Sequence, residues 1–149
     1  MAVIEYARNV LKIKKATSSE FSKTGVNVIG LIHEWNRDGK IFKGSKKELG
    51  GTMRLGLYEA KLKKNSLIQK IYRSNSINER HRHRYEVNID YKDKFEDKGL
   101  IFSGMSPDHK LPEIIELKNH PWFVGVQFHP EFKSRPLAPH PLFLSLIHI

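Results

Sequence analysis

A short apolar run that ends in a histidine and a glutamate constrains this chain more than any other feature of its sequence. Residues 123–128 read FVGVQF, and His129, Pro130 and Glu131 follow at once. A strand that is apolar at nearly every position is typical of a sheet covered on both faces. We therefore predict a buried strand in an α/β or α+β fold. Because reactive groups gather at the carboxyl ends of strands in open α/β sheets, the tripeptide is the first candidate site.

The spacing of His129 and Glu131 suits proton transfer. In an extended segment, side chains two residues apart point the same way, roughly 6–7 Å apart along the chain. Pro130 fixes its own φ and keeps His129 out of the helical region. An imidazole beside a carboxylate can act as an oriented general base and acid. A simple surface pair is the alternative, and the tripeptide alone leaves it open.

The rest of the chain alternates short helical and extended patterns. Helical spacing of apolar residues predicts an amphipathic helix over residues 1–13, and Ser66 is placed to begin a brief helix over 67–72. There is no internal repeat and no clear linker, so one α/β or α+β unit is the simplest expectation. The predicted strands cover 52–62, 79–88, 100–103 and 113–117, with loops at 16–26 and 36–47, an apolar run of uncertain type at 27–35 and a turn or short helix at 91–98.

Composition excludes several classes of protein. The 149 residues contain no cysteine and carry a formal net charge of +10. Disulfide scaffolds, Fe–S clusters, cysteine-ligated zinc and the zinc deaminase signature are therefore excluded for these residues. A zinc site built from His120, His129 and His140 is a weak alternative, because its spacing fits no familiar arrangement. There is no membrane-length apolar run, so the cytoplasm is the expected compartment.

A second candidate segment, ERHRHRYE at residues 79–86, alternates arginine and histidine. If this segment is extended, its side chains alternate between two faces, with Arg80, Arg82 and Arg84 on one and His81 and His83 on the other. Three interpretations stay open: an exposed strand edge, a grip on a small anion, or an RNA-binding surface with Tyr85 or Trp122 for stacking. The glycine-rich residues 50–56 lack the Lys-Ser/Thr of a phosphate loop and predict a tight turn before a strand.

Taken together, several segments resemble the glutamine amidotransferase domain of the CTP synthase family. They are GGTMRLG, ERHRHRYEVN, EIIEL, NHPWFVGVQFHPEFKSRPL and HPLF, in the family's order. The likeness runs from Met1 to about Phe143 and starts in AVIEYARNV, which resembles the helix after the family's catalytic cysteine. The resemblance implies a partial class I glutamine amidotransferase domain, a flavodoxin-like three-layer α/β fold without its N-terminal strands.

The resemblance also implies a reaction and its residues. In the family, glutamine hydrolysis supplies ammonia for the ATP-dependent amination of UTP to CTP, a step of pyrimidine nucleotide biosynthesis. His129 matches the catalytic histidine and Glu131 its orienting partner. Arg84 matches the residue that grips the glutamine α-carboxylate, and Glu20 the acid that contacts the substrate's amino-acid end.

The chain departs from the family pattern at both ends. The helix over residues 1–13 has no N-cap residue before it, and the tail SLIHI continues no family pattern. The family's cysteine elbow and oxyanion loop precede the segment that matches Met1. We therefore expect residues 1–149 to be a C-terminal portion of the domain, without the nucleophile elbow or the synthetase domain, and inactive alone.

The resemblance implies further partners and cofactors. The partners are L-glutamine, the synthetase domain of the same parent chain and, in the full enzyme, a tetramer; a membrane or nucleic-acid partner is not expected. No cofactor belongs to this segment, whereas the synthetase domain uses Mg-ATP and GTP is the activator. A basic RNA-binding module and a non-catalytic interaction domain are the alternatives.

Overall fold

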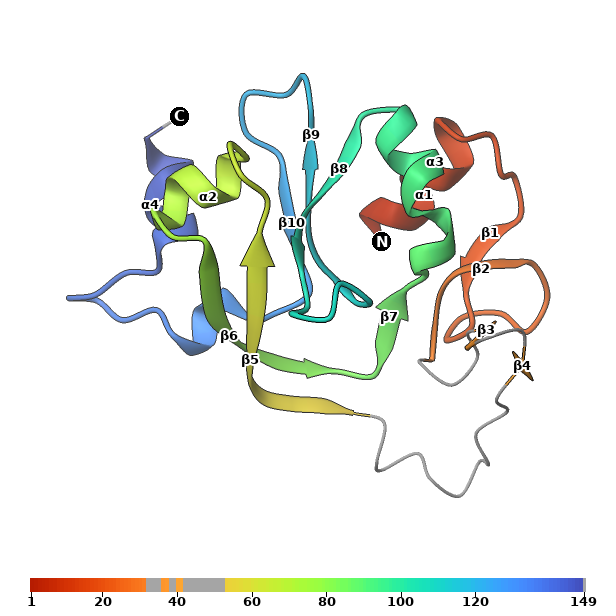
Figure 1. Cartoon of the computed structure of the whole chain (residues 1–149), viewed down its shortest axis with the longest axis horizontal. Helices are drawn as coiled ribbons and strands as arrows, with labels where there is room; N and C mark the ends of the chain where they lie inside the picture. The colour runs from red at the N-terminus through yellow and green to blue at the C-terminus, as the bar shows by residue number, and fades with distance from the viewer. Residues whose placement is uncertain (32–35, 38–39, 42–52, 149) are drawn as a thin grey trace. The chain divides into compact units, whose positions relative to one another are not determined.

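The computed structural model describes residues 1–31, 36–37, 40–41 and 53–148 (Figure 1). These residues form a mixed α/β structure, as the sequence predicts. The chain divides into two units, which are described separately. The first unit comprises Met1–Arg54 and His83–Lys98, and the second comprises Leu55–Arg82 and Gly99–Ile149.

The first unit is built on a three-stranded sheet in the order β1-β2-β7. β1 runs parallel to β2, and β7 runs antiparallel to it. Its elements are α1 (Ala2–Asn9), β1 (Ala16–Ser18), β2 (Val26–Leu31), the pair β3 (Asn36–Arg37) and β4 (Lys40–Ile41), β7 (Tyr85–Val87), the 3-10 turn η3 (Ile89–Tyr91) and α3 (Lys92–Asp97). Phe95 of α3 is completely buried and lies 6.2 Å from the ring of Tyr6 of α1. The two helices therefore share one apolar contact.

Two predictions for this unit are wrong in part. The first helix ends at Asn9 rather than residue 13, because the chain turns and Lys12 adopts a φ of +60°. The predicted loop 16–26 contains the strand β1, whose residues are all buried. Three residues are too few to show a period, so the pattern could not reveal this strand. Of the loop predicted over 36–47, the described residues form the β3-β4 pair; the rest of it, and the turn predicted at Gly50 and Gly51, lie outside the described residues.

The second unit is built on a five-stranded sheet in the order β10-β9-β8-β5-β6. Its elements are β5 (Arg54–Leu62), α2 (Leu67–Tyr72), β6 (Ser76–His83), β8 (Leu100–Met105), β9 (Pro112–Leu117), β10 (Val124–Val126), the 3-10 turn η4 (Pro130–Phe132) and α4 (Pro141–Ile147). The strands predicted at 52–62, 100–103 and 113–117 and the helix at 67–72 are confirmed. As predicted, Ser66 begins α2: its Oγ accepts a hydrogen bond from the Gln69 N–H at 3.2 Å.

The prediction that residues 123–128 form the most buried strand is wrong. All of β10 is only half-buried, whereas every residue of β9 except Leu117 is buried. β10 stands at one end of the sheet order and pairs antiparallel with β9. The argument from the carboxyl ends of parallel strands therefore does not apply to β10, although the site residues do follow it.

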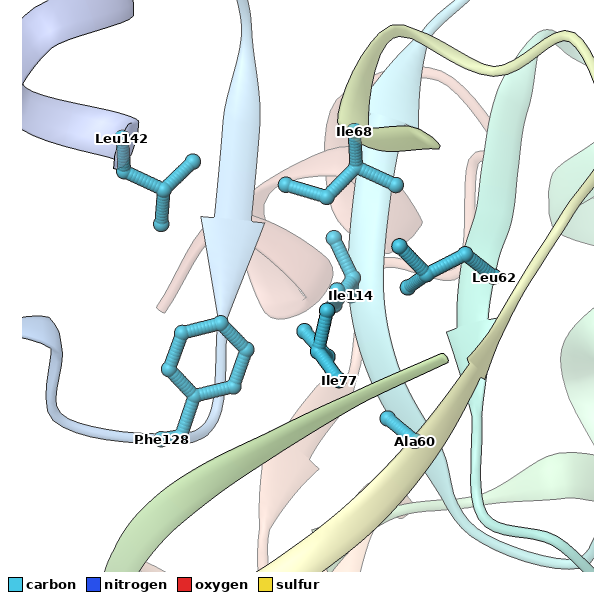
Figure 2. Close-up of a cluster of buried hydrophobic side chains, with 7 residues drawn as sticks. All are labelled: Ala60, Leu62, Ile68, Ile77, Ile114, Phe128 and Leu142. Atoms are coloured by element: carbon cyan, nitrogen blue, oxygen red, sulfur yellow. The ribbon is translucent and has the colours of Figure 1, made fainter. Parts of the chain in front are cut away.

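A buried apolar cluster lies beside this sheet (Figure 2). Strands and both helices contribute to it: the cluster comprises Ala60, Leu62, Ile68, Ile77, Ile114, Phe128 and Leu142. Phe128 is buried in this cluster and directly precedes His129. The core therefore fixes the chain at the point where the candidate site begins.

Candidate active site

The backbone around His129 is held by a neighbouring strand and a tight turn. The His129 N–H donates to the Arg80 carbonyl of β6 at 2.9 Å. His129 has φ −110° and ψ 91°, the extended conformation that a following proline favours. η4 then begins at Pro130, and the Phe132 N–H donates back to the His129 carbonyl at 3.1 Å.

The turn places the His129 and Glu131 side chains in direct contact. His129 Nδ1 lies 2.7 Å from Glu131 Oε1, so the predicted proximity is confirmed. The predicted extended geometry is wrong, because Glu131 lies inside the 3-10 turn. The His129 ring also stacks on Phe132, with centroids 4.7 Å apart and planes at 14°. The imidazole is thus oriented by a carboxylate at one edge and an aromatic ring on one face.

This geometry suits acid–base chemistry. A carboxylate that accepts from Nδ1–H selects one tautomer and leaves the Nε2 lone pair as a base. The hydrogen bond from His129, with a backbone N–H second, holds the pKa of Glu131 below its ordinary value. The two side chains are 36% and 56% exposed. An exposed ion pair adds little to stability. We therefore interpret this pair as a group for acid–base chemistry rather than as a contact that stabilises the fold.

Glu20 and Arg84 lie at the same end of the first unit's sheet. Ser18, the last residue of β1, pairs with Ile29, and Tyr85, the first residue of β7, pairs with Leu31. Glu20 follows that end of β1 and Arg84 precedes that end of β7. Within the described part of the chain, no hydrogen bond or ion pair joins them.

Their surroundings differ. Glu20 is exposed, and its N–H donates to Ser18 Oγ at 3.2 Å. Arg84 is half-buried, and its buried Nε has no hydrogen-bond partner among the residues that the structure describes. A buried donor without a partner calls for an explanation, and an anionic ligand supplies one. Glu20 and Arg84 belong to the first unit, whereas His129 and Glu131 belong to the second. The substrate-binding roles of Glu20 and Arg84 therefore stay predictions.

The alternating pattern of residues 79–86 is confirmed where it forms β6. Arg80 and Arg82 are exposed, whereas His81 between them is buried. His83 turns instead to Glu86, with Nε2 2.8 Å from Oε1. The strand therefore has one basic face and one face of buried titratable groups.

The three histidines of the zinc alternative have separate contacts. His129 pairs with Glu131, the His120 ring accepts from the Trp122 N–H, and His140 pairs with Glu79. Among the residues that the structure describes, no three His, Cys, Asp or Glu side chains are grouped to hold a metal ion. In the same residues, no helix is long and apolar enough to span a membrane.

One group beside the site was not singled out from the sequence. Glu79, Lys133 and His140 come together in the second unit, although they are 54 and 61 residues apart along the chain. All three lie within the segments on which the family resemblance rests. Their place in those segments was the available signal, but no local spacing connects them.

The comparisons with known proteins define the class. Residues 2–149 match the family model for glutamine amidotransferase class-I, and the chain belongs to this family. The chain is 35% identical, with a TM-score of 0.82, to a solved Trypanosoma brucei CTPS glutaminase domain with bound acivicin, covering 98% of this chain and 54% of that one. The predicted class I glutamine amidotransferase fold is thereby confirmed.

Within this class, the relatives point to one enzyme. The chain is 75% identical over 147 residues to the CTP synthase of Pelagibacter ubique and 58% identical over 148 residues to that of Agrobacterium fabrum. Each match covers 99% of this chain and 27% of the relative. The chain thus spans about a quarter of the length of these curated relatives. The family favours the glutaminase interpretation over the RNA-binding one.

Proposed function

We propose that this chain is the glutaminase portion of a CTP synthase, which hydrolyses L-glutamine and supplies ammonia for the ATP-dependent amination of UTP to CTP. The observation that carries the proposal is the 2.7 Å contact between His129 Nδ1 and Glu131 Oε1. The relatives named above support the choice of reaction. The alternative, a surface ion pair without a catalytic role, does not explain why the pair occurs in a chain of the glutamine amidotransferase class-I family.

In this proposal, each site residue has a separate task. The imidazole of His129 takes the proton of a cysteine thiol, and the thiolate attacks the glutamine amide carbon. His129 then protonates the departing ammonia, and water hydrolyses the thioester to glutamate. Glu131 orients the ring and stabilises the imidazolium.

Substrate binding falls to Arg84 and Glu20. The Arg84 guanidinium pairs with the α-carboxylate of glutamine, and Glu20 contacts its amino-acid end. The same proposal includes four features that rest on the family resemblance. They are Mg-ATP in the synthetase domain, activation by GTP, a tetrameric full enzyme and a cytoplasmic location.

The chain by itself is expected to release no ammonia from glutamine. Its 149 residues contain no cysteine, and members of such a triad act as a unit, so loss of the nucleophile removes most of the rate. The assay is ammonia release from the purified chain beside His129→Ala. Turnover above that variant would contradict the prediction that the chain alone is inactive.

The direct test is a hybrid enzyme. This chain replaces the matching 147 residues of the Pelagibacter ubique CTP synthase, and CTP formation is measured with glutamine and, separately, with free ammonia. We expect both to support CTP formation. His129→Ala should abolish only the glutamine-dependent reaction, and Arg84→Gln should raise the KM for glutamine. A hybrid that uses ammonia but not glutamine would refute the proposal.

A further inference from the structure

A buried carboxylate on β6 gathers three polar side chains. Glu79 Oε1 lies 3.0 Å from His140 Nε2, accepts from the Tyr72 hydroxyl at 3.1 Å and accepts from Lys133 Nζ at 3.3 Å. The Glu79 and His140 side chains are each only 2% exposed, whereas Lys133 is 39% exposed. Such a group needs a purpose, because burying a carboxylate is costly unless it is paired and hydrogen-bonded.

Lys133 brings a positive charge to this carboxylate, and His140 and Tyr72 contribute hydrogen bonds to it. His140 Nδ1 accepts from the Leu142 N–H at 3.3 Å, so Nε2 carries the proton that is donated to Glu79. Burial alone would raise the pKa of Glu79, but the contacts with His140, Lys133 and Tyr72 outweigh it and hold the pKa below its ordinary value. Lys133 is thus one of the side chains that stabilise the ionised carboxylate, and its ammonium group brings a positive charge.

Lys133 also closes the turn that carries the candidate catalytic pair. Its N–H donates to the Pro130 carbonyl at 3.1 Å, which ends η4. Its Nζ donates to the Asn78 carbonyl at 2.6 Å as well as to Glu79. At the other end of the turn, the His129 N–H donates to the Arg80 carbonyl. Three consecutive residues of β6 thus hold both ends of one five-residue turn.

The Lys133 contacts with β6 are a second anchor of the turn, after the His129 N–H, and the exposed His129–Glu131 pair requires it. Glu131 is 56% exposed, and the side chain that contacts its carboxylate, His129, is itself 36% exposed. A turn attached only through the His129 N–H could pivot about that one hydrogen bond and separate Glu131 from the ring. An anchor four residues further along removes this freedom, because both ends of the turn are then fixed to the same strand.

We propose that Lys133 is a positioning residue: by fixing the end of the turn to Asn78 and Glu79 of β6, it keeps the Glu131 carboxylate on His129 Nδ1 and so determines the imidazole tautomer. This inference rests on the proposed function, which gives that tautomer its use. The Glu79–His140 contact keeps the β6 end of the anchor rigid.

The test reads the His129 tautomer by ring-¹⁵N NMR in the 149-residue chain, at a pH where the ring is neutral and without substrate. Lys133→Met is the main variant and Lys133→Arg the conservative rescue. Lys70→Met is the matched control, since Lys70 is exposed on α2 of the same unit. His129→Ala assigns the signal.

In Lys133→Met we expect the ratio of Nδ1–H to Nε2–H to fall by about tenfold, the factor that corresponds to one net hydrogen bond. Lys133→Arg and Lys70→Met should keep the wild-type ratio. An unchanged ratio in Lys133→Met, or an equal fall in Lys70→Met, overturns the proposal and leaves Lys133 a structural role only.

Lys133→Met also removes the ammonium group beside the Glu79 carboxylate, so it can lower stability or prevent folding. The double variant Lys133→Met/Glu79→Gln also removes the carboxylate charge, whereas the anchor is still missing from it. It should regain stability yet show the same altered ratio, and a wild-type ratio in it overturns the proposal. Because no glutamine is used, a hybrid enzyme that fails with glutamine refutes the proposed function independently of this result.

Discussion

Two glycines face isoleucines of the neighbouring strand β9, and they make a graded test of packing in the second unit. Gly104 of β8 pairs with Ile114, and Gly125 of β10 pairs with Ile115. A Cβ at Gly104 would lie 2.6 Å from both Cδ1 and Cγ1 of Ile114 and 2.9 Å from its Cβ. A Cβ at Gly125 would lie 2.8 Å from Cγ1 and 3.1 Å from Cδ1 of Ile115. We predict that Gly104→Ala destabilises the chain more than Gly125→Ala does.

The magnitude follows from two opposing effects. Replacing glycine with alanine inside a strand gains about 0.5–1 kcal/mol of backbone entropy, whereas adding a methyl group to a filled core costs about 1–3 kcal/mol. At Gly125 the close atoms belong to the outer part of a flexible side chain, so the two effects nearly cancel. At Gly104 the Ile114 Cβ cannot move without the backbone, so the upper half of the strain applies. We expect a net loss of about 1–2 kcal/mol for Gly104→Ala and about zero for Gly125→Ala.

The assay is urea unfolding of both variants and wild type under one buffer condition. Ile114→Val, which removes Cδ1, costs about 0.5–1.5 kcal/mol alone, but in combination with Gly104→Ala it should recover about 1 kcal/mol relative to the sum of the two losses. Strict additivity would show that Ile114 is not what the new methyl meets. A loss at Gly125 equal to or larger than that at Gly104 would refute the packing argument.

Two further predictions concern the same unit. Ser66→Ala removes the N-cap hydrogen bond to Gln69, so it should lower the free energy of unfolding by about 1 kcal/mol, measured by urea unfolding against Ser74→Ala outside the helix. Because the pKa of Glu79 is lowered on folding, its stabilising contribution is present above its unfolded pKa and is lost as the pH falls through the folded pKa. The urea midpoint of wild type should therefore fall more steeply below about pH 4.3 than that of Glu79→Gln; parallel curves would contradict this assignment.

Local periodicity predicted which segments are strands better than which face of each is buried. Met53, Leu55 and Leu57 alternate with other residues and so predict the strand at 52–62 with these side chains on its buried face. Leu55 and Leu57 are nevertheless 65% and 59% exposed. The buried apolar residues of β5 lie at its other end, at Ala60 and Leu62, where it pairs with β8. The partner strand decides burial, and a single strand's pattern does not contain it. The same reason explains β10, which stands at one end of the sheet order, where it pairs with β9.

The candidate site shows the same division between local and distant information. The contact of His129 with Glu131 was predictable because two residues and a proline determine most of it. The anchor of that turn was not, since Lys133 meets Asn78 and Glu79 across 55 and 54 residues of chain. His129 and Glu131 are close in sequence, but the contacts that hold their turn come from residues distant in sequence. The geometry of the pair therefore depends on the position of β6 beside the turn. Substitutions on the buried face of β6 should therefore alter the chemistry of His129 without touching its ring.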